Sequence, residues 1–224
     1  MKKLYMFDLD GTLIDPHTAI TKGIQFALSH IGIHVDDRNE LNCFIGPPIR
    51  DSLREFYQID DPATVEPLVE KYLEYFAKNG IYENSLYSGV LTMLETLQAT
   101  DCILTIATSK LMTNAIKIAK HLQFSHYFEQ IIGSELGGGR SQKVEVISHL
   151  LSLTDPKNEH LAIMIGDRKY DIIGAKKAEQ ALNRRIISIG CTWGYAAPNE
   201  LKTENPDFIA NNIAELTTHL TTLS

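Results

Sequence analysis

The sequence has no hydrophobic run long enough to cross a membrane and no block of more than two consecutive basic residues. A membrane span needs about 18 or more apolar residues in succession, so an integral membrane protein is not expected. The formal net charge is -7, and an acidic chain is a poor electrostatic partner for nucleic acids and for anionic membrane surfaces. We therefore expect neither a nucleic acid nor a membrane among the partners.

Cysteine is also scarce. Cys43, Cys102 and Cys191 are far apart and include no C-x-x-C pair, so the sequence predicts buried thiols in a reducing compartment instead of a disulfide framework. The first residues lead directly into a charged motif and show no signal-peptide pattern. The expected location is the cytoplasm.

The chain of 224 residues is 44% hydrophobic, which is enough to bury a full core and a small second domain. Short apolar runs without polar alternation are typical of strands buried on both faces of a parallel sheet. Helical patterns lie between these runs, and strand-helix alternation predicts a doubly wound α/β fold. The predicted strands are Lys3–Phe7, Cys102–Ala107, Gln130–Ile132, Leu161–Ile165 and Arg185–Ile189.

One connection between predicted strands is too long for a simple crossover, because about 90 residues separate the first strand from the second. This interval contains two apolar stripes at helical spacing, one from Ile20 to Ile31 and one from Val65 to Phe76. We predict a helical domain at residues 16–84, inserted into a core domain made of residues 1–15 and 85–224.

The motif D-L-D-G-T follows the first predicted strand and contains Asp8 and Asp10. Alternate residues of an extended segment project to the same side, so these two like charges are held close together. An EF-hand calcium loop is excluded, because Leu13 and Ala19 stand where glycine and glutamate are required. The functional interpretation is a nucleophilic carboxylate at Asp8 and a general acid and base at Asp10.

A second carboxylate pair follows the predicted strand Leu161–Ile165. Asp167 occupies the same strand-end position as Asp8, and Asp171 follows four residues later. Asp171 could instead be an ordinary acidic residue in the first turn of a helix. If the two strands are neighbours, three carboxylates converge, and such a cluster of oxygen ligands favours Mg²⁺.

Two further sites could bind phosphate. Thr108 and Ser109 offer hydroxyl groups, and Lys110 a charge, at the end of another predicted strand, where Thr and Ser could equally cap a helix. Lys143 begins a helical pattern, although a single lysine is usually a solvated surface charge. Lys143 is a candidate site residue because of its order among the other sites along the chain.

The ordered set D-L-D-G-T, Thr-Ser, Lys and G-D-x-x-x-D resembles the haloacid dehalogenase superfamily of phosphatases over nearly the whole chain. The resemblance implies a sheet in the order 3-2-1-4-5, which places the first and fourth strands side by side. It also implies that a helical cap lies between the first two motifs, where it excludes water and selects the leaving group.

The resemblance assigns expected roles to individual residues. Asp8 is expected to be the nucleophile and Asp10 the acid and base, whereas Thr108 and Lys143 hold the transferring phosphoryl group. Mg²⁺ is expected to bind Asp8, the Asp10 carbonyl and Asp167, with Asp171 orienting Asp167 or the metal's waters. Gly11, Thr12 and Ser109 complete the expected phosphate site.

The stretch FIGPPIRDSLREFY in the expected cap, and TWGYAAPNEL near the C-terminus, resemble phosphoglycolate phosphatases. Pro47 and Pro48 would open a helix that aims Arg50 at the crevice, where a guanidinium suits a second carboxylate or phosphate on the substrate. The alternative is a surface arginine paired with Asp51 or Glu55.

The expected function is Mg²⁺-dependent hydrolysis of a small phosphorylated metabolite, most similar to phosphoglycolate, by a monomer or a dimer. A 5'-nucleotidase, a sugar-phosphate phosphatase and a phosphomutase of the same fold remain open. A dehalogenase would not need the metal cluster. A receiver-type signalling domain, a non-enzyme, would carry its phosphorylated Asp in mid-chain and would lack the insert.

Overall fold

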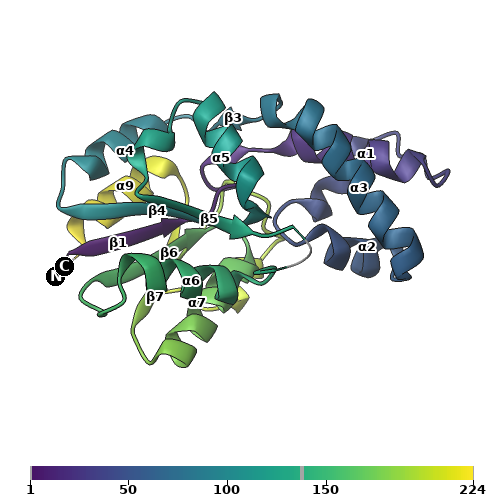
Figure 1. Ribbon diagram of the computed structural model, residues 1–224. Coiled ribbons are helices and arrows are strands. Elements are labelled where there is room, and N and C mark those ends of the chain that lie inside the picture. The colour runs from purple at the N-terminus through teal and green to yellow at the C-terminus, as the bar shows by residue number, and fades with distance from the viewer. Residues whose placement is uncertain (1, 137–138, 224) are drawn as a thin grey trace.

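The centre of the molecule is a parallel sheet (Figure 1). The computed structural model describes residues 2–136 and 139–223, and within them the sheet has the order β5-β4-β1-β6-β7-β8. The strands are β1 (Lys3–Phe7), β4 (Cys102–Leu111), β5 (Gln130–Ser134), β6 (Leu161–Gly166), β7 (Ile186–Cys191) and β8 (Phe208–Ala210). Counted over the five predicted strands this order is 3-2-1-4-5, so the predicted fold class is confirmed. The three-residue edge strand β8 was not predicted.

Helices cover both faces of the sheet, and β1 shows why. Leu4 and Met6 belong to one cluster of buried apolar residues, and Tyr5 and Phe7 to another, because successive side chains of a strand point to opposite faces. The first pair packs with α6 (Lys143–Thr154) and α7 (Lys169–Leu182). The second pair packs with α4 (Val90–Gln98), α5 (Met112–His121) and α9 (Ile213–Thr222). The short helices η3 (Ser125–Tyr127) and α8 (Glu200–Thr203) lie in connections.

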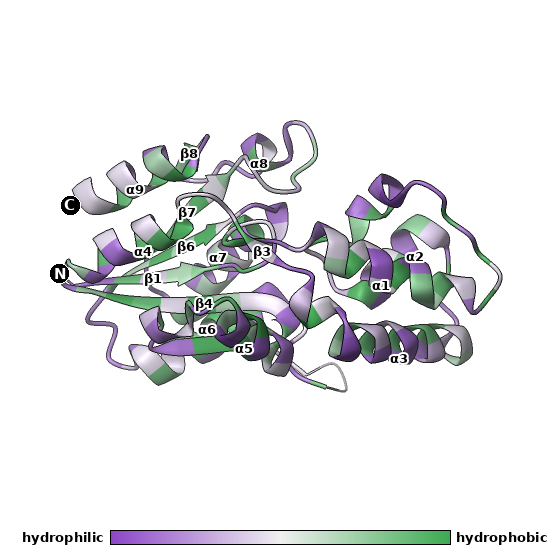
Figure 2. Cartoon of the chain, turned by 90° about the horizontal axis from the view of Figure 1, so that it is seen from above, coloured by the Kyte–Doolittle hydropathy of each residue, from purple (hydrophilic) through white to green (hydrophobic). Residues whose placement is uncertain are grey.

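The long connection after β1 is helical and lies beyond one end of the sheet (Figures 1 and 2). It contains α1 (His17–Ser29), η1 (Arg38–Phe44), α2 (Ile49–Tyr57), α3 (Pro62–Lys78) and η2 (Gly80–Tyr82). We call residues 16–84 the helical insert. Buried apolar residues of α1, η1, α2 and α3 belong to one core cluster, and the apolar residues of these helices are coloured green in Figure 2. That residues 16–84 form a separate domain stays a prediction.

The chain enters and leaves the helical insert through a two-stranded antiparallel ribbon. Its strands are β2 (Ile14–Asp15) and β3 (Ser85–Leu86), which pair residue for residue. One predicted member of the first apolar stripe, Ile31, falls after the end of α1 and is 42% exposed. The reason is Gly32, whose φ of +79° turns the chain away from helical geometry.

None of the described helices is both long and apolar enough to span a bilayer. The three cysteines are free thiols, and of these only Cys191 is fully buried, whereas Cys43 and Cys102 are partly exposed.

Candidate active site

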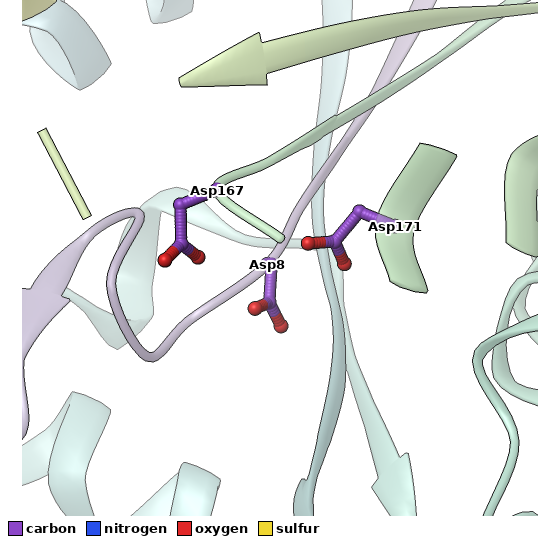
Figure 3. A group of neighbouring side chains, drawn as sticks. All are labelled: Asp8, Asp167 and Asp171. Carbon is purple, nitrogen blue, oxygen red and sulfur yellow. The ribbon is translucent and has the colours of Figure 1, made fainter. Parts of the chain in front are cut away.

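Three carboxylates meet at the carboxyl ends of two neighbouring strands. Asp8 follows β1 and Asp167 follows β6, and these strands pair in parallel with Phe7 opposite Ile165. Asp171 lies in the first turn of α7. One carboxylate oxygen from each of the three residues lies within 4.8 Å of the others, and Figure 3 shows the side chains converging from β1, β6 and α7. The predicted convergence is therefore present in the structure.

The cluster is buried, which makes its negative charge costly. The exposed fractions of Asp8, Asp167 and Asp171 are 4%, 0% and 1%. Burial, and then the neighbouring charges of Asp171 and Asp8, raise the pKa of Asp167 well above its usual range. Burial also raises the pKa of Asp171 to about 6, although Lys143 opposes the shift. A hard cation bound between these oxygens would remove the repulsion.

Lys143 reaches this cluster from the first position of α6. Its Nζ donates hydrogen bonds to Asp8 Oδ1 at 2.8 Å and to the Ala107 carbonyl at 2.9 Å, and it lies 2.8 Å from Asp171 Oδ1. Gly174 leaves room for it, because a Cβ there would lie 2.6 Å from the Lys143 Cγ. Lys143 is thus a buried partner of the carboxylates and not a solvated surface charge.

Asp10 lies beside a second lysine, Lys110, which was predicted to offer a charge near phosphate but not to pair with Asp10. Lys110 Nζ donates to Asp10 Oδ2 at 2.6 Å and lies 4.6 Å above the ring of Phe76 in α3. Asp10 Oδ1 is buried and has no hydrogen-bond partner among the described residues. Burial raises the pKa of Asp10, and Lys110 opposes the shift. Lys110 therefore fixes one oxygen of Asp10, and the other has no partner among the described residues.

The segment Thr108–Lys110 is part of a strand and not a helix cap. β4 continues past its predicted end at Ala107 as far as Leu111, with a register shift against β5, and α5 begins only at Met112. Thr108 is buried, and its Oγ1 accepts a hydrogen bond from the Lys110 amide at 3.1 Å. The alternative interpretation as a helix N-cap is wrong, and the phosphate-binding roles of Thr108 and Ser109 stay predictions.

The turn after Asp10 packs directly on Asp167. Gly11 has a φ of +83°, and a Cβ there would lie 2.2 Å from Asp167 Oδ2, so both the backbone conformation and the close approach require glycine. Thr12 Oγ1 donates to Asp167 Oδ1 at 3.2 Å. In this structure Gly11 and Thr12 therefore position a carboxylate, and their predicted contact with phosphate stays untested.

The loop after β7 also reaches Asp167, which sequence reasoning missed. The Tyr195 amide donates to Asp167 Oδ2 at 2.7 Å. Trp193 Nε1 donates to the Thr12 carbonyl at 3.1 Å. The available signal was the position of Trp193 and Tyr195 directly after a strand of the same sheet, because the carboxyl ends of parallel strands share one edge.

A cavity of about 270 Å³ lies between the helical insert and the carboxyl ends of β4 and β5. Its polar side includes Asp10, Ser109 and Lys110. Its apolar wall comes from α1, η1 and α3 of the helical insert: Ile20, Ile24, Phe44, Val69, Tyr72, Leu73 and Phe76. A group that enters this cavity meets Asp10, Ser109 and Lys110 on one face and aromatic side chains on the other.

Arg50 lies in the lining of this cavity, and its partner is not one of those predicted. Its guanidinium donates to Glu66 through Nε at 2.8 Å and through Nη2 at 2.7 Å. The predicted alternative partners, Asp51 and Glu55, were wrong, because Asp51 pairs with Arg54 instead. A contact between Arg50 and a substrate stays a prediction.

The chain is similar to several known proteins. A 5'-nucleotidase from Pseudomonas aeruginosa is 38% identical over 211 residues, which is 94% of this chain and 92% of that protein. Tyrosine-protein kinase PtkA from Mycobacterium tuberculosis is 31% identical over 99% of this chain and 70% of its own length. The crystal structure of a predicted phosphatase from Clostridium acetobutylicum superposes with a TM-score of 0.91, at 36% identity and with both chains fully covered.

The family model described as Haloacid dehalogenase-like hydrolase matches residues 5–182. This range contains Asp8, Thr108, Lys143 and Asp167, which the structure brings to one edge of the sheet. The chain belongs to the haloacid dehalogenase-like hydrolases.

Proposed function

We propose that this phosphatase of the haloacid dehalogenase family hydrolyses phosphate monoesters with Mg²⁺ and through a phosphorylated Asp8. The observation that carries the proposal is the paired arrangement of Asp8 and Asp10. Asp8 lies in a buried cluster with Asp167, Asp171 and Lys143, and Asp10 has one free buried oxygen next to the cavity. Such an arrangement supplies a nucleophile and a proton donor close together in the chain at one strand end.

The donor set fits Mg²⁺. Asp8, Asp167 and Asp171 offer carboxylate oxygens within 4.8 Å of one another, and hard oxygen ligands are those that Mg²⁺ prefers. The residues that would hold the ion are Asp8, Asp167 and the Asp10 carbonyl, with Asp171 in support. When bound, the ion supplies positive charge that offsets the negative charge of the carboxylates and of the phosphoryl oxygens.

The residues of the chain perform two displacements. An oxygen of Asp8 attacks phosphorus while Asp10 gives its proton to the leaving oxygen, so that the ester bond breaks and an aspartyl-phosphate forms. Asp10 then takes a proton from a water molecule, which attacks the same phosphorus and releases inorganic phosphate and free Asp8. Lys143, which donates to Asp8, offsets the charge that spreads over the phosphoryl oxygens.

For the substrate, the cavity favours a leaving group with an aromatic or apolar body. Phe76, Tyr72 and Phe44 form much of the wall that faces Lys110, and aromatic rings stack on one another with offset or edge-to-face geometry. A nucleoside 5'-monophosphate matches this wall, in agreement with the activity named for the Pseudomonas relative. Phosphoglycolate, with a leaving group that has only two carbons, remains the second candidate and depends on Arg50.

The test is a comparison of kcat/KM over a panel of phosphate esters, with and without Mg²⁺. The panel contains nucleoside 5'-monophosphates, phosphoglycolate, glucose 6-phosphate and p-nitrophenyl phosphate. We expect many turnovers per protein, loss of activity with chelator, and the highest values on nucleotides. Stoichiometric labelling without release of phosphate would instead indicate a receiver-type domain, and transfer back to the sugar would indicate a mutase.

Arg50 separates the two substrate candidates. If its guanidinium binds a substrate carboxylate, Arg50→Ala should lower kcat/KM for phosphoglycolate by about tenfold to a hundredfold, because a hydrogen bond to a charged group is worth roughly 1.5–3 kcal/mol. The variant should hydrolyse p-nitrophenyl phosphate, which has no carboxylate, almost as well as the wild type. The ratio of the two losses removes any general effect on the helical insert.

Matched variants sharpen this prediction. Arg54 lies one turn later in α2 and pairs with Asp51. Arg54→Ala should therefore leave kcat/KM unchanged for both substrates. Glu66→Gln should raise kcat/KM for phosphoglycolate, since it releases Arg50 from its present partner. Equal losses on both substrates in Arg50→Ala would show that Arg50 supports the helical insert and does not recognise a carboxylate.

A further inference from the structure

Residues 192–195, which we call the 192–195 loop, pack against Asp167. The Tyr195 amide donates to Asp167 Oδ2 at 2.7 Å. Gly194 lies so close that a Cβ on it would be 2.2 Å from the same oxygen. The orientation of the Asp167 carboxylate therefore depends on the position of this loop as well as on Thr12, which donates to the other oxygen.

The side chain of Tyr195 extends in another direction, to the start of the helical insert. Its hydroxyl donates to Asp15 Oδ1. The same oxygen accepts a hydrogen bond at 3.0 Å from the amide of His17, the first residue of α1. Burial and the bond to Asp15 raise the pKa of Tyr195, so its hydroxyl keeps its proton and remains a donor at neutral pH.

Asp15 belongs to the ribbon through which the chain enters and leaves the helical insert. It pairs with Ser85 of β3. Tyr87 follows β3, its amide donates to the Leu13 carbonyl at 3.1 Å, and burial together with Asp15 raises its pKa. Both covalent connections to the helical insert thus lie in this small cluster, and any pivot of the insert about the sheet displaces it.

We propose that Tyr195 is a positioning residue that couples the placement of the helical insert to the orientation of Asp167. One residue holds Asp15 with its side chain and Asp167 with its amide. Movement of the ribbon away from the sheet displaces the Tyr195 hydroxyl, and this displaces the Tyr195 amide relative to Asp167. By linkage the effect is reciprocal, so a fixed Asp167 also holds the insert in place over the cavity. The role in metal binding rests on the function proposed above.

The test compares Tyr195→Phe with Tyr87→Phe. Tyr195→Phe keeps the ring and the amide but removes the hydroxyl. We expect it to raise the half-saturating Mg²⁺ concentration for hydrolysis about tenfold, the lower end of the effect usual for partners of metal ligands. Excess Mg²⁺ should restore kcat in this variant, whereas it would not restore the activity of a misfolded protein. Tyr87→Phe removes a neighbour of the same hydroxyl but leaves both the bond from Tyr195 to Asp15 and the amide bond to Asp167, so the Mg²⁺ requirement should stay within about twofold of the wild type.

Hydrogen exchange tests the coupling without metal. In Tyr195→Phe the amide of His17 should exchange about fivefold faster than in the wild type, because the hydroxyl no longer restrains its acceptor Asp15. Asp167→Ala, at the far end of the connection, should accelerate the same amide. Unchanged exchange at His17 in Asp167→Ala, or an unchanged Mg²⁺ requirement in Tyr195→Phe, would overturn the proposal. If wild-type hydrolysis needs no Mg²⁺, the proposed function fails, and the exchange measurements alone decide the coupling.

Discussion

Asp8→Asn is expected to abolish turnover, with a loss of about 10⁴-fold or more in kcat, the scale usual for removal of a nucleophile. An amide does not attack phosphorus, and the variant also loses one of the three carboxylate charges of the cluster. The fold should remain intact, because asparagine has nearly the same volume and still accepts the hydrogen bond from Lys143. The measurement is steady-state release of inorganic phosphate with saturating Mg²⁺.

A matched control is Asp36→Asn, an exposed aspartate of the helical insert, which should keep wild-type activity. A residual rate in Asp8→Asn within about tenfold of the wild type would exclude Asp8 as nucleophile, because removal of a nucleophile lowers the rate by far more than this. Water would then have to attack the substrate directly.

Lys143→Met is expected to give the largest loss of stability among single substitutions at the site. Lys143 is 5% exposed and pairs with Asp8 and Asp171. Removing one member of a buried ion pair leaves its partners without compensation, which costs about 3–5 kcal/mol of the free energy of unfolding. Urea unfolding without Mg²⁺ measures this loss, and Lys177→Met, on the exposed side of α7, is the control.

The loss should depend on pH in a defined direction. Although burial alone would lower the pKa of Lys143, Asp171 and Asp8 raise it, so Lys143 stays charged below the ordinary lysine range and its ion pairs stabilise the wild type wherever the carboxyl partners are ionised. In the variant the pKa of Asp171, already raised to about 6, rises further. That destabilisation is complete above the raised pKa and disappears as the pH falls toward ordinary carboxyl values.

The stability difference between Lys143→Met and the wild type should therefore be large near about pH 8 and clearly smaller near about pH 5, where the carboxyl groups bind protons. Turnover should fall as well, since the phosphoryl charge loses its lysine. A difference below about 1 kcal/mol at the higher pH, comparable to that of an exposed ion pair, would contradict the buried role assigned to Lys143.

The features that could be predicted from sequence are those set by strand ends. Asp8 and Asp167 follow apolar runs that only a buried parallel sheet explains, and the shared edge of such a sheet brings strand ends together. Asp171 could be predicted as a third member of the cluster because it lies one helical turn after Asp167 in the chain. Lys143 was predicted from its order in a family pattern and not from its surroundings, because a lone lysine at the start of a helix has no distinctive local signal.

The features that were missed depend on tertiary packing. Lys110 pairs with Asp10 because β4 extends beyond Ala107 with a register shift, and no apolar pattern marks that extension. The pair of Arg50 and Glu66 joins α2 to α3, so it depends on how two helices cross. The hydrogen bond from the Tyr195 amide to Asp167 does not depend on side-chain type, so the sequence can indicate the position of the loop after β7 but not this bond.

The most direct test of the central claim is detection of a phosphoryl group on Asp8. Asp10→Asn can still form the intermediate from p-nitrophenyl phosphate, whose leaving group needs no proton, but lacks the base that activates water. Acid quenching after mixing with Mg²⁺, followed by peptide mass spectrometry, should show one phosphoryl group on the peptide that contains Asp8, together with a burst of one nitrophenol per protein. Release of phosphate at the wild-type rate, with no adduct on that peptide, would contradict the account.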